Sequence, residues 1–236
     1  MAQAPKRFYK RVEVKADANG FGILLDGRPL KTPAKSPFQL PSAALAEAIG
    51  GEWDSQDGSI DPTTMPLTAL VFTALDRIAP QPTALSEELK RYLGTDLVCY
   101  RAERPDDLVA AQVQAWDPLL DWLEERMGVR LAVTSGVLAI DQDAATVARL
   151  AELFPLSDPF RLSALSAVTA ATGSVVIGLA LMLRQLDADR AYQAAFVDEL
   201  FQAGRWGEDT EAQARRAAIR AELQGAEHLI ALLVPH

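Results

Sequence analysis

Apolar and charged positions alternate near the start of the chain, and this pattern predicts a small antiparallel sheet. Val12 and Val14 alternate with charged residues, as in a strand with one buried face. An apolar run at 21–25 predicts a second strand. The Asp-Gly pair at 26–27 is a strong hairpin signal, because both residues tolerate a positive φ. Residues 28–32 are expected to return as an edge strand, since the proline among them cannot donate to a sheet.

Two helices are predicted between this sheet and the prolines at 80 and 82. Ser42 is a suitable N-cap for the first helix, which runs towards Trp53, although two consecutive glycines weaken it. Pro66 is suited to the first turn of the second helix. The apolar residues of this second helix share one face, and they are Leu67, Leu70, Val71, Ala74 and Ile78.

Beyond residue 82 the apolar positions repeat with a helical period almost throughout. One apolar stripe consists of Val113, Trp116, Leu120, Leu123 and Met127. An Asp-Pro pair at 117–118 interrupts the stripe, which predicts either one kinked helix or two. Further helices are expected to start near Ser86, Asp106 or Asp107, Thr146, Asp158, Asp187 (running through Leu200), and Asp209 or Thr210.

These patterns predict an α+β protein of two domains. A small β-containing domain is expected at residues 1–80, and a larger all-helical domain at 81–236. The boundary is placed at the Pro-Gln-Pro sequence at 80–82, because proline ends a helix.

Residues 163–183 contain no charged side chain, and a segment of this length can span a bilayer. The first half of the segment is rich in small and hydroxyl-bearing residues, and only 175–183 is strongly apolar. A helix that is apolar on nearly all sides is also what the centre of a helical domain requires. The pattern therefore favours a buried core helix and no membrane insertion. A membrane-attached assembly factor anchored by this segment stays the alternative.

The composition is that of an ordinary globular protein, with 49 % hydrophobic and 23 % charged residues among 236. The net charge of −9 disfavours nucleic acid as a partner, because binding to polyphosphate needs a basic surface. The charge is uneven: residues 1–35 carry +5 and the remainder carries −14. This basic start could steer an anionic partner, and the alternative is a solvated pair of strands.

The residue types needed for common enzymatic chemistry are scarce. The chain has one cysteine and two histidines, and it contains no phosphate-binding loop or nucleophile-elbow motif. The carboxylate pairs Asp117 with Asp121 and Asp198 with Glu199 could hold a divalent ion in a metal-assisted hydrolase. Acid pairs on helices are more often solvated. The sequence therefore favours a binding protein with no catalytic residues, no cofactor and no metal.

The tryptophans are the most distinctive residues. Trp116 lies in an apolar stripe and is expected in the core. Trp206 stands in Gly-Arg-Trp-Gly at 204–207, where exposure and burial are both open interpretations. An exposed Trp beside an Arg would be typical of an energetically important interface residue.

Several segments, taken in order along the chain, resemble one family of assembly chaperones. They are Arg-Phe-Tyr-Lys at 7–10, Asp-Gly-Arg-Pro-Leu-Lys-Thr-Pro at 26–33, Glu-Trp-Asp-Ser-Gln at 52–56, Met-Pro-Leu-Thr at 65–68, Thr-Asp-Leu-Val-Cys-Tyr-Arg at 95–101, Trp-Asp-Pro at 116–118 and Asp-Glu-Leu-Phe-Gln-Ala-Gly-Arg-Trp-Gly at 198–207. The chain is similar in these segments to the chaperones of the alpha subunit of the ATP synthase catalytic head.

The resemblance implies the same two-domain fold and a function without catalysis. A member of this family holds the unassembled alpha subunit, shields its subunit interface, and releases it for assembly of the alpha–beta ring. We expect a monomer with this subunit as partner. The resemblance also implies client-binding residues, which are Asp198, Glu199, Gln202, Arg205 and Trp206, and Trp53 is added to them as a further candidate.

Asp198, Gln202 and Arg205 are spaced to share one helix face. This face is predicted to meet the client. The alternative is a helix packed by Phe196 and Leu200 that carries ordinary surface charges.

The first residues contain no apolar core of a secretory signal. Mitochondrial members of the family carry presequences, and the segment ahead of the first strand is too short for one. We therefore expect a bacterial cytoplasmic protein, or a mitochondrial matrix protein if the chain is a processed eukaryotic form.

Overall fold

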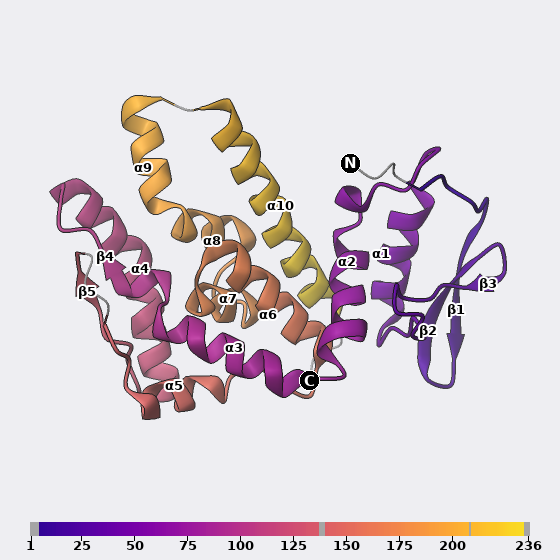
Figure 1. The fold of residues 1–236 in the computed structure, drawn as a ribbon, viewed down its shortest axis with the longest axis horizontal. Coiled ribbons are helices and arrows are strands. Elements are labelled where there is room, and N and C mark those ends of the chain that lie inside the picture. The colour runs from indigo at the N-terminus through magenta and orange to yellow at the C-terminus, as the bar shows by residue number, and fades with distance from the viewer. Residues whose placement is uncertain (1–4, 137–139, 208, 234–236) are drawn as a thin grey trace.

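The computed structural model describes residues 5–136, 140–207 and 209–233. A sheet with two helices forms the N-terminal part, and a larger group of helices lies beside it (Figure 1). The predicted α+β class is confirmed.

The N-terminal sheet has three antiparallel strands in the order β1 (Val12–Asp17), β2 (Gly20–Leu25) and β3 (Arg28–Pro29). Asp26 and Gly27 have φ angles of 50° and 77°, which confirms the predicted hairpin turn. β3 is shorter than the predicted 28–32 and lies at the edge of the sheet, as its proline requires.

Helix α1 (Ala43–Asp54) packs against this sheet and is capped as predicted, because the Ser42 hydroxyl accepts a hydrogen bond from the Leu45 N–H. The two glycines do not break the helix. At Gly50 a Cβ would lie 3.4 Å from the Val14 side chain, so the small residue allows α1 to approach the sheet closely.

Helix α2 (Pro66–Thr73) begins at its predicted proline and continues into a π-helical turn, η2 (Ala74–Ile78). The carboxylate of Glu52 accepts hydrogen bonds from the Leu67 and Thr68 N–H groups at 2.7 and 2.8 Å. This carboxylate therefore satisfies the start of α2 from the neighbouring helix α1.

The helical part contains eight helices among the described residues: α3 (Pro82–Gly94), α4 (Asp106–Met127), α5 (Ala144–Ala151), α6 (Pro159–Thr172), α7 (Val175–Met182), α8 (Ala188–Ala195), α9 (Val197–Trp206) and α10 (Thr210–Leu232). A short parallel pair joins β4 (Tyr100–Arg101) to β5 (Thr134–Ser135), and the sequence did not predict it. Helix α4 is continuous through Pro118. Of the two alternatives predicted for this segment, a single helix is therefore the correct one. Its N-cap is Pro105, so the prediction that Asp106 or Asp107 caps it is wrong, and both acids lie in its first turn.

The uncharged segment 163–183 is largely buried, but it is not the single helix that its composition predicts. Gly173 adopts a left-handed conformation with φ of 71° and ends α6. The Ser174 hydroxyl then accepts a hydrogen bond from the Ile177 N–H and starts α7. No helix in the described part of the chain is long and apolar enough to cross a membrane.

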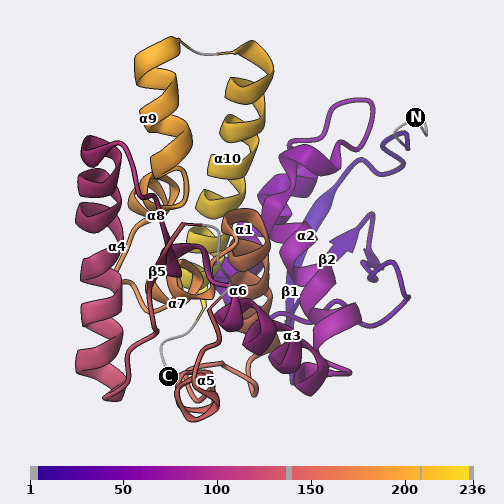
Figure 2. The same ribbon diagram turned by 60° about the vertical axis from the view of Figure 1, so that its left-hand side comes forward.

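A second predicted helix is also divided in two. Phe196 leaves the helical conformation between α8 and α9, with φ of −115° and ψ of 24°. Its side chain is buried and stacks near Tyr192, with ring centroids 5.1 Å apart. This break changes the direction of the chain, so that α9 lies against α4 (Figure 2).

The long helix α10 connects the two parts, since it packs against α6, α8 and α2. The Ser42 hydroxyl donates to the Leu232 carbonyl at 2.6 Å, and the Ser163 hydroxyl donates to the Leu70 carbonyl at 2.8 Å. The buried apolar side chains of both parts form one cluster. The division at residue 80 stays a prediction.

Candidate partner-binding site

Helix α9 and the start of α10 project from the rest of the molecule in both views (Figures 1 and 2). Five of the six predicted client-binding residues lie on α9, and Trp53 lies on α1. The candidate site is therefore centred on α9 and on the helices that flank it.

One face of α9 is held against α4 by a buried amide. Gln112 is 1 % exposed, and its Nε2 donates to Asp198 Oδ1 at 2.7 Å. Its Oε1 accepts a hydrogen bond from the Ala102 N–H at 2.8 Å. Asp198 is half-buried and has a defined structural partner.

Arg205 binds α4 near the far end of α9. Its guanidinium forms an ion pair with Asp107 and lies 4.7 Å from the centre of the Phe201 ring. Asp198 and Arg205 thus share a face of α9, as their spacing predicts, and both contact α4. Gln202 lies between them in sequence and is exposed.

The acid next to Asp198 points in another direction. Glu199 lies 3.9 Å from Arg215 of α10 and is half-buried. The two adjacent carboxylates therefore face different helices, α4 and α10, and they do not form a pair that could share one metal ion.

Trp206 ends α9 with 75 % of its surface exposed. Of the two interpretations of this residue, the structure selects exposure. Trp116 has the opposite environment, as predicted: it is 1 % exposed, and its Nε1 donates to the Ala194 carbonyl at 2.7 Å.

An open groove runs between α4 and the α8–α9 pair, with a volume of about 740 Å³. We call it the α4–α9 groove. Its walls are mainly apolar, and its lining residues are Ala111, Gln114, Ala115, Leu186, Arg190, Gln193, Ala194, Val197, Leu200 and Phe201. The last lining residue on α9, Phe201, comes five residues before Trp206, which is about 7.5 Å along the helix at a rise of 1.5 Å per residue. An apolar groove and an exposed Trp thus lie along the same helix.

Trp53 is not part of this arrangement. Its side chain is 7 % exposed and lies 5.7 Å from the Tyr9 ring in the N-terminal part. The Tyr9 hydroxyl donates to the Trp53 carbonyl at 2.6 Å. Trp53 therefore offers little surface to a partner.

The carboxylates considered for catalysis have protein partners. Asp117 forms an ion pair with Arg101 at 2.8 Å, and Asp121 forms one with Arg130. Within the described ranges, no cluster of three or more His, Cys, Asp or Glu residues could hold a metal ion. Burial raises the pKa of the Cys99 thiol to about 12, which makes it a poor nucleophile.

The buried face of α4 was partly missed from sequence. The predicted stripe of α4 included Val113, but this residue is 45 % exposed. The buried face instead runs through Leu108, Gln112 and Trp116. The signal in the sequence was that Gln112 lies four residues from both Leu108 and Trp116, which places all three on one face of the helix. A buried amide on that face requires hydrogen-bond partners.

A projecting helix with an exposed Trp and an adjoining apolar groove is typical of a protein that binds other proteins. The comparisons agree with this class. A family model described as ATP12 chaperone protein matches residues 6–124. The crystal structure of Atp12 from Paracoccus denitrificans is 40 % identical, with a TM-score of 0.89, over 98 % of this chain and 99 % of that one.

Two further relatives extend the similarity. A solved structure from Agrobacterium tumefaciens is 42 % identical, with a TM-score of 0.91, over 97 % of this chain and 86 % of that one. Protein atp12, mitochondrial, of Schizosaccharomyces pombe is 27 % identical over 86 % of this chain and 74 % of its own length. The chain belongs to the ATP12 chaperone family, which confirms the resemblance found in its sequence. It is an ATP synthase assembly chaperone, a role that is not catalytic.

Proposed function

We propose that this chain binds the unassembled alpha subunit of the ATP synthase catalytic head, shields its subunit interface, and performs no catalysis. A subunit made for a ring exposes an apolar interface until its neighbour arrives, and such a surface tends to aggregate. A chaperone that covers this surface must bind reversibly, so that the beta subunit can displace it.

The exposure of Trp206 is the observation that carries this proposal. A Trp that is 75 % exposed leaves a large apolar surface in water, and a partner would cover it. Trp and Arg are enriched among the residues that dominate binding energies, and Arg205 directly precedes Trp206. The α4–α9 groove gives the same partner an apolar surface further along α9.

The acidic residues of α9 contribute differently to the proposed contact. Asp198 uses one carboxylate oxygen to accept the hydrogen bond from Gln112, which leaves the other for a cation of the client. Glu199 points toward α10, and the Gln202 side chain is exposed. An acidic surface of this kind suits a client with exposed Arg or Lys.

Co-purification tests the client and the site together. The wild-type chain is expected to retain isolated alpha subunit and not isolated beta subunit. Trp206→Ala should weaken retention of alpha by about tenfold or more, because the side chain would lie at the centre of the contact. Its melting temperature should stay within a few degrees of wild type, since the residue is exposed.

Leu156→Ala is the matched control, because Leu156 is also an exposed apolar residue, at 43 %, and lies outside α9. It should retain alpha as the wild type does. Equal retention of alpha and beta would refute the proposed client. Unchanged retention by Trp206→Ala would refute the site.

We further propose that the chain acts as a monomer in a bacterial cytoplasm, and that a processed eukaryotic form would act in the mitochondrial matrix. The solved relatives from Paracoccus and Agrobacterium support the first setting, and the mitochondrial relative from Schizosaccharomyces supports the second. Light scattering is expected to give a mass near 25.5 kDa. A mass twice as large would contradict the monomer.

A further inference from the structure

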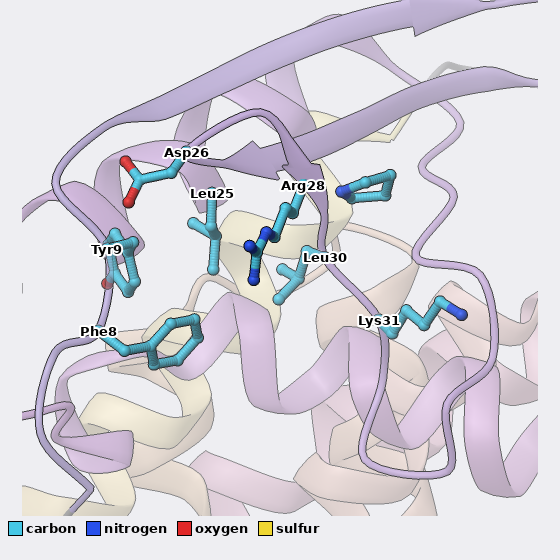
Figure 3. A pocket seen from close by; sticks show the side chains of 8 residues that line it. Phe8, Tyr9, Leu25, Asp26, Arg28, Leu30 and Lys31 are labelled. Carbon is cyan, nitrogen blue, oxygen red and sulfur yellow. The ribbon is translucent and has the colours of Figure 1, made fainter.

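A second concave surface lies at the opposite part of the molecule from α9, where the N-terminal segment crosses the hairpin (Figures 1 and 3). Its volume is about 520 Å³. We call it the hairpin pocket, and the lining residues that matter here are Phe8, Tyr9, Asp26, Arg28, Leu30 and Lys31.

A single carboxylate fixes the two sides of the hairpin pocket relative to one another. Asp26 accepts hydrogen bonds from the backbone N–H groups of Lys10 and Arg11 at 3.1 and 2.9 Å. These bonds lower the pKa of Asp26, so it stays ionised at neutral pH. They also hold the adjoining Phe8 and Tyr9 beside the hairpin turn.

The pocket has an apolar base with an unusual exposed ring above it. Leu25 and Tyr9 are buried, and Leu30 is half-buried. Phe8 is 72 % exposed and meets the Tyr9 ring edge to face, with centroids 5.3 Å apart. In Figure 3 the Phe8 ring and the Arg28 guanidinium point into the same space.

The two cations of the pocket have no counterion of their own. Neither Arg28 nor Lys31 has a side-chain hydrogen bond or ion pair with any residue that the structure describes, and both are exposed. The single acid in the lining, Asp26, is already bound to backbone N–H groups. The pocket therefore offers the unpaired charge of Arg28 beside an apolar surface, and that of Lys31 at its edge, where the Lys31 side chain extends away from the Phe8 ring (Figure 3).

We propose that the hairpin pocket binds an acidic segment of a partner protein, in which carboxylates flank a Leu or Phe side chain. The carboxylates would pair with Arg28 and Lys31, and the apolar side chain would pack on Phe8 and Leu30. Recognition runs through side chains, because Pro29 in the edge strand has no N–H to offer an added strand.

Charge selects this occupant over polyanions. Two unpaired cations are few compared with the phosphate contacts that a nucleic acid needs, so a short segment with two or three carboxylates matches the charge of the pocket better. The pocket is in a different part of the molecule from α9, and the inference does not depend on the identity of the client that α9 binds.

Fluorescence anisotropy of the full chain tests the inference. The probes are labelled short peptides in which Asp and Glu flank one Leu or Phe, and matched peptides in which Asn and Gln replace the acids. The acidic peptides should bind about tenfold more tightly than the amide peptides, and added salt should weaken them. Arg28→Glu and Phe8→Ala should each cost about tenfold in affinity.

Arg91→Glu is the matched control, because Arg91 is also an exposed arginine and lies on α3, outside the pocket. It should bind the acidic peptides as the wild type does. Absence of peptide binding, or equal losses in Arg28→Glu and Arg91→Glu, would overturn the inference. So would binding of phosphatidylserine vesicles or single-stranded DNA that depends on Arg28 more strongly than peptide binding does.

These outcomes are separable from those of the client experiment. Phe8→Ala leaves α9 intact, so loss of peptide binding with normal retention of the alpha subunit would support the hairpin pocket alone. Failure to retain the alpha subunit would leave the peptide result unaffected.

Discussion

At the scale of single residues, Asp96 is the most consequential buried charge. The side chain is completely buried, and it accepts hydrogen bonds from the Ser174 hydroxyl at 2.6 Å and the Val176 N–H at 3.1 Å. It also accepts from the Val98 N–H at 3.2 Å. Asp96 therefore connects the turn before β4 to the start of α7, which are far apart in sequence.

This environment predicts a specific pH dependence of stability. Burial raises the pKa of Asp96, and the hydrogen bonds from Ser174 and the backbone offset part of that rise, so the pKa moves from 3.8 to about 6. The folded state therefore holds the proton to higher pH than the unfolded state does. The contribution of Asp96 to stability is complete below about pH 4 and falls as the pH rises through about 6.

Urea unfolding of the wild type and Asp96→Ala across this range measures the effect. The difference in free energy of unfolding between them should shrink by about 1–3 kcal/mol from pH 4 to pH 7. Asp61→Ala is the control, because Asp61 is exposed and its hydrogen bonds with Thr63 lower its pKa. The difference in free energy of unfolding between the wild type and Asp61→Ala should stay constant from pH 4 to pH 7. A difference for Asp96→Ala that grows with pH would contradict the prediction.

At the scale of elements, the break between α6 and α7 separates two helices that would otherwise be one. Gly173 has a φ of 71°, a conformation that side chains disfavour, although a Cβ there would meet no neighbouring atom. Any cost of a substitution is therefore a backbone cost and not a steric clash with the core.

Gly173→Ala is expected to lower the free energy of unfolding by about 1 kcal/mol. Gly94→Ala is the matched control: Gly94 is in α3, a Cβ there also meets no atom, and its φ is not positive. This change should be neutral or stabilise by about 0.5 kcal/mol. Denaturant unfolding compares the two, and equal effects would show that the left-handed conformation costs nothing.

Whether a feature could be predicted from the sequence depends on how far apart in the chain the residues that determine it are. The 26–27 hairpin, the Ser42 cap and the start of α2 at Pro66 were predictable, because each depends on residues that are adjacent in the chain. The break at Gly173 was not, since Gly-Ser also occurs inside buried helices. Its second determinant, Asp96, lies in another segment.

The same distinction holds for the candidate site. The residues of α9 could be listed from the sequence, but their environments could not. The hydrogen bond between Gln112 and Asp198 and the ion pair between Arg205 and Asp107 join residues far apart in the chain. The exposure of Trp206 was undecided, because only the placement of α9 beyond the other helices determines it.

At the scale of the whole molecule, α2 contacts both parts. It packs against α1 on one side and against α6 and α10 on the other. The approach to α10 is so close that a Cβ at Gly225 would lie 2.9 Å from the Pro66 ring. Leu67 and Val71 are buried, at 2 % and 0 % exposure. These contacts place α2 in the core of the helical part, although it precedes the predicted boundary.

Two fragments test where the boundary lies. One contains residues 81–236, and the other contains 65–236 and so retains α2. We expect the longer fragment to melt cooperatively and the shorter one to melt about 10 °C lower or to be unfolded, because removing α2 uncovers the apolar faces of α6 and α10.

Both fragments lack the sheet and α1, so the difference between them isolates the contribution of residues 65–80, which form α2 and η2. Thermal melts followed by circular dichroism measure it, with the full chain as reference. Equal melting temperatures would support a boundary at residue 80 and show that α2 adds nothing to the helical part. The expected difference in melting temperature would instead place the domain boundary before Met65. The contact between α2 and α10 would then be what joins the part with the hairpin pocket to the part with α9.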